Sequence, residues 1–187
     1  MRICVFCSSS EDIDESYREA AKDLGTLMAR GSHELVFGGG RIGLMGVLVH
    51  GAHEAGGRAT GIIPGFMHER GVAADEHCSK LIITADMRER KAKMEELAEA
   101  FLILPGGFGT CEEVLEILTL KQLRRHTKAV VFLNTRGYFD KLLGFFEHMY
   151  EEHFAGEALR ETYEVVATPA EALVYLESYL AGAVPDK

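Results

Sequence analysis

Short apolar runs alternate with longer amphipathic stretches along the whole chain. Such runs are typical of strands that are buried on both faces of a sheet. We predict strands at residues 2–7, 34–37, 59–63, 80–84, 100–104, 130–133 and 163–167. Between them, apolar residues recur three and four positions apart, which indicates helices. These are predicted at residues 13–30, 43–55, 87–99, 138–153 and 169–180, with a further helix from the glycines near residue 109 to about residue 125. Residues 66–79 have weak periodicity and are predicted to form a loop or short helix.

Strict alternation of strands and helices predicts an α/β fold, a Rossmann-like doubly wound parallel sheet with helices on both faces. No linker or repeat divides the chain, so residues 1–187 are predicted to form one domain. Sheets of this kind bind ligands beyond the carboxyl ends of their strands. A serine run at residues 8–10 and glycine-rich turns at 38–40 and 105–110 leave those ends. We therefore expect a phosphorylated small molecule to bind where these segments meet.

Charge and composition narrow the functional class. The chain carries a formal net charge of −9, which argues against a nucleic-acid partner, because nucleic-acid-binding proteins normally present a basic surface. No apolar run approaches the roughly 20 residues that a membrane-spanning helix needs. The N-terminal sequence MRICVF enters a strand without a signal-peptide pattern. We therefore expect a cytoplasmic protein with no membrane partner.

Neither the cysteines nor the histidines form a recognisable metal site. Cys4 and Cys7 form a C-x-x-C sequence, but both belong to the first predicted strand, where positions three apart face opposite sides. The other two cysteines are isolated, so we predict reduced, partly buried thiols. His50 and His53 share a helix face, yet no third ligand lies at a suitable spacing. No metal is predicted.

The most informative segment is LPGGFGTCEEV at residues 104–114, where a strand enters a glycine-rich turn and then a helix. Glycines let the backbone approach a ligand closely, and the first N–H groups of a helix are unpaired and carry partial positive charge. This combination predicts an anion site, most often for phosphate. Glu113 lies one turn into the helix, close enough to act on the bound molecule.

A second charged segment, DMRERK at residues 86–91, begins a helix directly after a strand. Met87, Arg90 and Lys91 lie three and four positions apart and share a helix face. Arg90 and Lys91 would add charge-assisted hydrogen bonds beside a phosphate site. Arg88 is predicted to be solvated.

A nicotinamide dinucleotide site is the obvious alternative. Gly38, Gly40 and Gly43 satisfy G-x-G-x-x-G between a strand and a helix. However, the motif follows the second strand rather than the first, and the next strand ends without an acidic residue for a ribose hydroxyl. We therefore set the dehydrogenase interpretation aside.

Three segments resemble the signature motifs of one family. GGGRIGLMG at 38–46, DMRERK at 86–91 and PGGFGTCEE at 105–113 are similar in order and spacing to those of the LONELY GUY (LOG) family. Its members are cytokinin riboside 5′-monophosphate phosphoribohydrolases, once mislabelled as possible lysine decarboxylases. The resemblance covers essentially the whole chain. A lysine decarboxylase is the least favoured function, because nothing marks a Schiff-base lysine with a pyridoxal phosphate site.

The resemblance implies hydrolysis of the N-glycosidic bond of a nucleoside 5′-monophosphate, releasing an adenine-type base and ribose 5-phosphate. It implies Arg90 and Glu113 as catalytic residues, a homodimer and no cofactor. The family motifs and the sheet edge together give the predicted substrate-binding positions. These are Ser8, Gly39, Gly40, Met87, Lys91, Gly106, Gly107, Phe108, Gly109, Thr110, Cys111, Glu112 and Thr119.

The expected mechanism follows from the chemistry of glycoside hydrolysis. The base leaves ribose through an oxocarbenium-like state. Glu113 would stabilise that charge and orient or deprotonate water, and Arg90 would orient the substrate near its phosphate or ribose. The backbone of residues 106–110 would hold the 5′-phosphate. We assign no glycosyl-enzyme intermediate, because no second paired carboxylate is evident, and Glu112 and Glu116 are predicted to be solvated or structural.

Three departures from the family pattern bear on base preference. Ser8 stands where a glycine is usual, Arg88 stands where many members have histidine, and Cys111 occupies a variable position. Two other functions stay open. One is a carrier or sensor similar to the molybdenum-cofactor carriers, which binds without cleaving. The other is a general nucleosidase acting on AMP, GMP or pyrimidine nucleotides.

Overall fold

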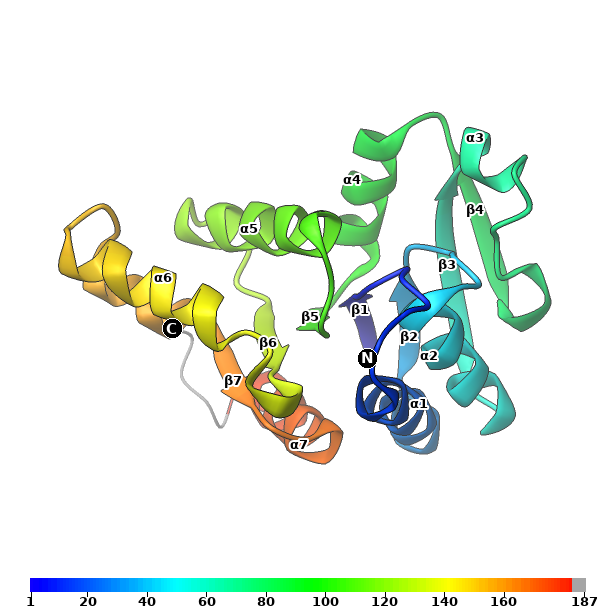
Figure 1. Ribbon diagram of the computed structural model, residues 1–187, viewed down its shortest axis with the longest axis horizontal. Helices are drawn as coiled ribbons and strands as arrows, with labels where there is room; N and C mark the ends of the chain where they lie inside the picture. The colour runs from blue at the N-terminus through cyan, green and yellow to red at the C-terminus, as the bar shows by residue number, and fades with distance from the viewer. Residues whose placement is uncertain (183–187) are drawn as a thin grey trace.

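Seven strands pair in parallel in the order β4-β3-β2-β1-β5-β6-β7 in the computed structural model, which describes residues 1–182 (Figure 1). The strands are β1 (Arg2–Phe6), β2 (Glu34–Phe37), β3 (Arg58–Pro64), β4 (Lys80–Thr84), β5 (Ala100–Ile103), β6 (Ala129–Leu133) and β7 (Glu164–Val166). From β1 the chain builds outward to β4, then returns to the other side of β1 and builds outward from β5 to β7. The switch point of the sheet therefore lies between β1 and β5.

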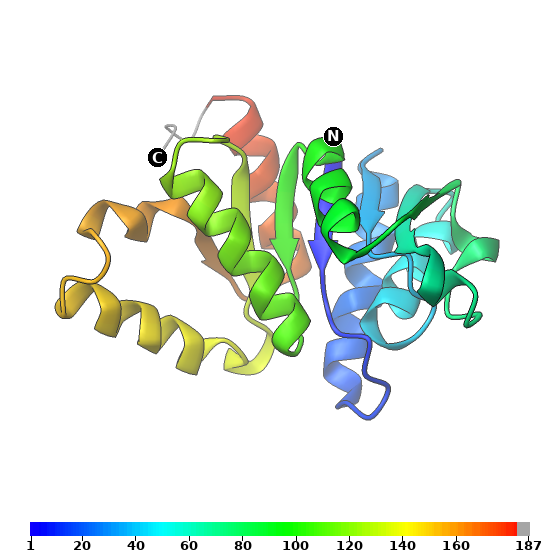
Figure 2. The ribbon, with the colours of Figure 1, turned by 90° about the horizontal axis from the view of Figure 1, so that it is seen from above.

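Helices cover both faces of this sheet, as Figure 2 shows from above. The helices are α1 (Glu15–Arg30), α2 (Gly43–Glu54), α3 (Gly65–His68), α4 (Met87–Leu97), α5 (Phe108–Gln122), α6 (Asp140–Glu151) and α7 (Pro169–Leu180). Short 3-10 helices are η1 (Asp75–His77), η2 (Thr135–Gly137) and η3 (Glu157–Thr162). One apolar core joins the sheet to α1, α2 and α7, and the other joins it to α4, α5 and α6. This confirms the predicted fold class.

Alternation along β1 explains why two cores form. Ile3 and Val5 belong to the core under α1 and α2, whereas Cys4 and Phe6 belong to the opposite core. Cys7 returns to the first core, so Cys4 and Cys7 face opposite sides as predicted. Both are buried free thiols, and burial raises the pKa of each well above its usual value.

Several predicted helix and strand ends were wrong by a few residues, and local hydrogen bonds explain two of the helix ends. The first helix begins at Glu15 rather than residue 13, because Asp14 is its N-cap and accepts a hydrogen bond from Ser16 N. The helix predicted to end at residue 99 ends at Leu97, because Glu99 is turned toward β1 and its carboxylate accepts a hydrogen bond from Arg2 N. The helix predicted from residue 138 begins at Asp140, and that predicted to reach residue 125 ends at Gln122. Residues 66–79 contain α3 and η1, which fits the predicted loop or short helix.

The predicted strand ends differ by smaller amounts. The first strand ends at Phe6, the third spans Arg58–Pro64, the fifth ends at Ile103, the sixth begins at Ala129, and the seventh is shortened to Glu164–Val166. Parallel pairing with the neighbouring strands sets these limits.

The segments that leave β1, β2 and β5 meet at one edge of the sheet, as predicted. Ser8 N donates to Pro105 O at 3.1 Å, and Leu44 N donates to Ser8 O at 2.9 Å. A Cβ atom on Gly43 would lie 2.4 Å from the carbonyl carbon of Ser9, and its φ is +62°, so only glycine fits there. Within residues 1–182, no helix is long and apolar enough to cross a membrane.

Candidate functional site

The N-terminus of α5 forms the first half of the site. After β5 the chain passes through residues 104–107 and enters α5 at Phe108. Gly107 is the N-cap and supplies no side chain to the first N–H groups of the helix. Cβ atoms on Gly107 and Gly109 would meet nothing within 4 Å, so this end of the helix is open. Uncapped N–H groups at the start of a 15-residue helix favour an anion.

Contacts from both sides hold residues 105–110, which we call the phosphate loop after the ligand predicted for it. A Cβ atom on Gly106 would lie 2.1 Å from Thr110 Oγ1, so the close packing of the buried Thr110 requires glycine there. The hydroxyl of Tyr138 donates to Gly106 O at 2.7 Å. Sequence reasoning did not include Tyr138 in the site, because no spacing rule connects residue 138 with this loop.

A buried ion pair forms the second half of the site. Arg90 on α4 donates from Nη2 to Oε1 of Glu113 on α5 at 2.9 Å, and their side chains are 10% and 9% exposed. Asp86 caps α4 by accepting from Arg88 N and Glu89 N, which fixes the start of the helix. The two predicted catalytic residues are therefore in direct contact, although they lie 23 positions apart.

Burial and the positive charge of Arg90 shift the pKa of Glu113 in opposite directions. Burial raises the pKa of its carboxyl group from 4.5 to about 7, although the positive charge of Arg90 favours ionisation. The carboxylates of Glu112 and Glu116 raise the pKa further, whereas Lys91 lowers it. A carboxyl group that titrates near neutral pH can accept a proton from water and release it again.

Lys91 connects α4 to α5 rather than facing the phosphate loop. Its ammonium group pairs with the carboxylate of Glu112 and lies 2.9 Å from Glu116 Oε2. This fits the structural alternative predicted for the two glutamates. Lys91 and Glu113 also line a cavity of about 280 Å³ between the two helices. A direct contact of Lys91 or Glu112 with substrate stays a prediction.

The remaining predicted binding residues fall into two groups. Ser8, Gly39 and Gly40 follow β1 and β2 at the carboxyl edge of the sheet, where Ser8 N donates to Pro105 O. Met87 begins α4, and its Sδ lies 3.6 Å from Arg90 Nη1. Phe108 and Cys111 lie in the first turn of α5, where Phe108 is 97% exposed.

Thr119 lies elsewhere on α5. Its hydroxyl donates to Leu115 O at 2.7 Å, and it lines a cavity between α5 and α6. Within one subunit the structure does not bring it to the phosphate loop.

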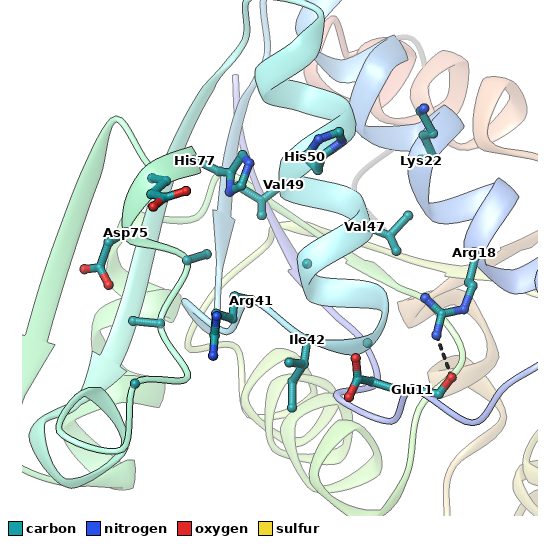
Figure 3. A pocket seen from close by; sticks show the side chains of 16 residues that line it. Glu11, Arg18, Lys22, Arg41, Ile42, Val47, Val49, His50, Asp75 and His77 are labelled. Carbon is teal, nitrogen blue, oxygen red and sulfur yellow. Dashed lines mark hydrogen bonds between the residues drawn. The ribbon is translucent and has the colours of Figure 1, made fainter.

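Another cavity lies apart from the ion pair. It measures about 640 Å³ and is lined by residues of α1, α2 and η1 and of the turn after β2 (Figure 3). Arg18, Arg41 and His50 line it together with Glu11 and Asp75, so its charges are mixed. Within residues 1–182, no group of three or more histidine, cysteine or acidic side chains is arranged to hold a metal ion.

Comparison with known proteins places the chain among characterised relatives. A family model described as "Possible lysine decarboxylase" matches residues 45–176. The cytokinin riboside 5′-monophosphate phosphoribohydrolase LOG3 of Arabidopsis thaliana is 42% identical over 178 residues, which cover 95% of this chain and 82% of that protein. The phosphoribohydrolase LOG of Oryza sativa subsp. japonica is 40% identical and covers 96% of this chain and 74% of that protein.

A solved structure with the same fold is the molybdenum cofactor carrier protein of Chlamydomonas reinhardtii. It matches with a TM-score of 0.72 at 25% identity, covering 96% of this chain and 98% of that one. The plant phosphoribohydrolases are more similar in sequence over the same length. The chain therefore belongs to the LOG family of cytokinin riboside 5′-monophosphate phosphoribohydrolases, whose family model carries the older description "Possible lysine decarboxylase".

Proposed function

We propose that this chain hydrolyses the N-glycosidic bond of nucleoside 5′-monophosphates with adenine-type bases, including cytokinin nucleotides, and releases the free base and ribose 5-phosphate. The observation that carries this proposal is the buried Arg90–Glu113 pair beside an uncapped helix N-terminus. Family membership supports the same reaction, since relatives at 40–42% identity are named for it.

The phosphate loop is suited to the 5′-phosphate of the substrate. Backbone N–H groups at the start of α5 would bind its oxygens, and the open space at Gly107 and Gly109 admits the ligand. Holding this remote group aligns the reacting bond without further loss of entropy. Binding energy at the phosphate thus contributes to the rate as well as to affinity.

Glu113 would act at the anomeric carbon. As the C1′–N bond breaks, its electron pair leaves with the base, and the carboxylate stabilises the positive charge on ribose. Water then adds to C1′, and its proton passes to Glu113, while the departing base is protonated from solvent. Arg90 keeps the carboxylate oriented through its hydrogen bond to Oε1.

A carrier that binds the phosphorylated ligand without cleaving it is the alternative, because molybdenum cofactor carriers share the fold. Pure binding does not require a buried carboxylate that titrates near pH 7, so the state of Glu113 favours turnover.

A panel assay separates these functions. The purified protein is incubated with AMP, GMP, pyrimidine monophosphates and isopentenyladenosine monophosphate, and free base is measured by chromatography. The matching nucleosides without phosphate are the control and should release little base. Release from isopentenyladenosine monophosphate alone indicates cytokinin production, whereas release from several nucleotides indicates a general nucleosidase. Binding without release of any base would replace the hydrolase by the carrier.

We also infer a homodimer in the cytoplasm. The four cysteines are free thiols, which is typical of a reducing compartment. For the dimer, the support is an apolar groove between α5 and α6, the α5–α6 groove, lined by Leu115, Leu118, Met149 and Leu159 among others. Leu115 remains 43% exposed in the single chain.

A further inference from the structure

Gly38 lies in direct contact with the guanidinium group of Arg90. It follows β2 and is buried at the carboxyl edge of the sheet. A Cβ atom on residue 38 would lie 2.3 Å from Arg90 Nη2 and 3.0 Å from Cζ. These separations are far below van der Waals contact, so any side chain at this position would displace the guanidinium group.

The backbone at Gly38 does not itself require glycine. Its φ lies outside the left-handed region, in contrast to the next residue, Gly39, whose φ is +71°. A side chain at position 38 would therefore not be strained by a left-handed φ. The requirement for glycine therefore comes from the space that Arg90 occupies.

The other sides of the guanidinium group are also filled. Glu113 Oε1 accepts from Nη2 at 2.9 Å, and Met87 Sδ lies 3.6 Å from Nη1. A Cβ atom on Gly38 would also come within 3.2 Å of Met45 Sδ, so a second thioether borders the same space. Arg90 is only 8% exposed, and its Nε is buried without a partner among the described residues. Glu113, Met87 and the backbone of residue 38 therefore border the guanidinium group on three sides.

We propose that Gly38 is a positioning residue. Because it has no side chain, it leaves the space, here called the seat, in which the Arg90 guanidinium group lies against Glu113. Its effect on catalysis rests on the proposed hydrolase function. Its effect on packing does not, because the seat exists whether or not the enzyme turns over. Sequence reasoning included Gly39 and Gly40 in the site but omitted Gly38, since a glycine-rich turn after a strand indicates a ligand loop rather than space for an arginine.

The first test compares Gly38→Ala with Gly65→Ala. Gly65 also follows a strand at this edge, but a Cβ atom there would meet Ile83 Cγ2 at 3.7 Å and Thr84 O at 3.8 Å, which are ordinary contacts. Gly38→Ala should lower kcat by about 10²-fold with little change in KM, since small misplacements near reacting groups have effects of this size. Gly65→Ala should keep the wild-type kcat.

A shift in the pH profile separates positioning from general damage. Without the Arg90 charge beside it, the pKa of Glu113 rises above about 7, because Arg90 is the main group that favours its ionised form. Glu112, Glu116 and Lys91 also act on this carboxyl group and stay in place. The acidic limb of kcat/KM should therefore move to higher pH in Gly38→Ala. An unshifted limb with reduced kcat would contradict positioning through Arg90.

The second test is a double-mutant cycle that uses thermal unfolding and does not depend on activity. Gly38→Ala should lower Tm in the wild-type background. In an Arg90→Lys background it should lower Tm much less, because lysine has no atom at the position of Nη2. An equal loss of Tm in both backgrounds would overturn the proposal. If wild-type protein releases no base, the hydrolase function fails, yet the cycle still decides whether Gly38 seats Arg90.

Discussion

Glu113 illustrates how environment gives an ordinary carboxyl group a function. Burial alone would keep it protonated at neutral pH, and a single exposed arginine nearby would keep it ionised. Here Arg90 is buried with it, so the two effects oppose each other and the pKa lies at about 7. Both protonation states are accessible at physiological pH, which suits a group that accepts a proton in each turnover.

Removing this carboxylate should abolish most of the activity. We expect Glu113→Gln to lower kcat by about 10²–10⁴-fold, the contribution that general acid–base groups typically make. KM should change little, because the phosphate loop is untouched. Base release is measured on the best substrate of the panel, and circular dichroism checks the fold. Glu96→Gln, which removes an exposed carboxylate from α4, is the matched control and should keep full activity. Near-normal turnover by Glu113→Gln would remove this residue from its role.

The pH dependence follows from the sign of the pKa shift. Glu113 acts as a carboxylate, and its raised pKa makes that form predominate only above about pH 7. We therefore expect kcat/KM to rise with pH from 5 to 8, with a midpoint near the raised pKa of about 7 rather than the ordinary 4.5. A stopped assay in buffers of constant ionic strength measures the profile. A flat profile between pH 5 and 8 would show that Glu113 is not the group whose ionisation limits the rate.

Some residues of the site could be predicted from the sequence, and others could not. Arg90 and Glu113 were identified because each lies in a motif with a recognisable spacing. The contact between Arg90 and Gly38, and the pairing of Lys91 with two glutamates, depend on how α4 packs against α5 and β2. No periodicity along the chain encodes that packing.

At the scale of elements, continuous apolar runs predicted every strand. β1, β2, β3, β5 and β6 are buried over nearly their whole length and tolerate few polar residues. The edge strand β4 is also apolar in sequence, although Ile83 is 54% exposed. Helix ends were harder to predict. The helix predicted from residue 138 starts at Asp140 because η2 comes first, with Arg136 at a φ of +57°. That local conformation competes with helix propensity and leaves no clear pattern in composition. η3 was missed for the same reason.

The connection between the phosphate loop and the start of α6 gives a further prediction. Tyr138→Phe removes the hydroxyl that donates to Gly106 O and leaves the aromatic ring packed against Tyr17 and Phe139. We expect KM for the nucleotide to rise by about two- to tenfold, which corresponds to the loss of one hydrogen bond. kcat should fall less, because Glu113 and Arg90 stay in place. Steady-state kinetics with AMP provides the measurement. An unchanged KM would show that the loop keeps its conformation without Tyr138.

At the scale of the whole molecule, the sheet order explains why one edge collects the site. β1 and β5 are neighbours, and the chain leaves them toward α1 and α5 on opposite faces of the sheet. Ser8 and residues 105–107 therefore border a cavity of about 220 Å³ at this edge. Sequence reasoning predicted a parallel sheet and the edge where ligands bind. It did not predict the strand order, because pairing of β1 with β5 joins segments that are far apart in the chain. Only tertiary packing selects that partner.

The proposed dimer is tested at the apolar groove between α5 and α6. Leu115→Glu places a charge on its rim, where a second copy would bury it without a partner, so we expect the variant to be monomeric. Val174→Glu is the control, since Val174 is an exposed apolar residue on α7, across the sheet, and is 63% exposed against 43% for Leu115. Light scattering coupled to size exclusion measures the mass of each protein. Wild type and Val174→Glu should have twice the chain mass of 20.6 kDa, and Leu115→Glu should have the mass of one chain.

A dimeric Leu115→Glu would place the interface elsewhere, and a monomeric wild type would refute the dimer. If dissociation also lowers kcat while leaving α5 folded, the second subunit completes the site near Thr119, which lines the same groove.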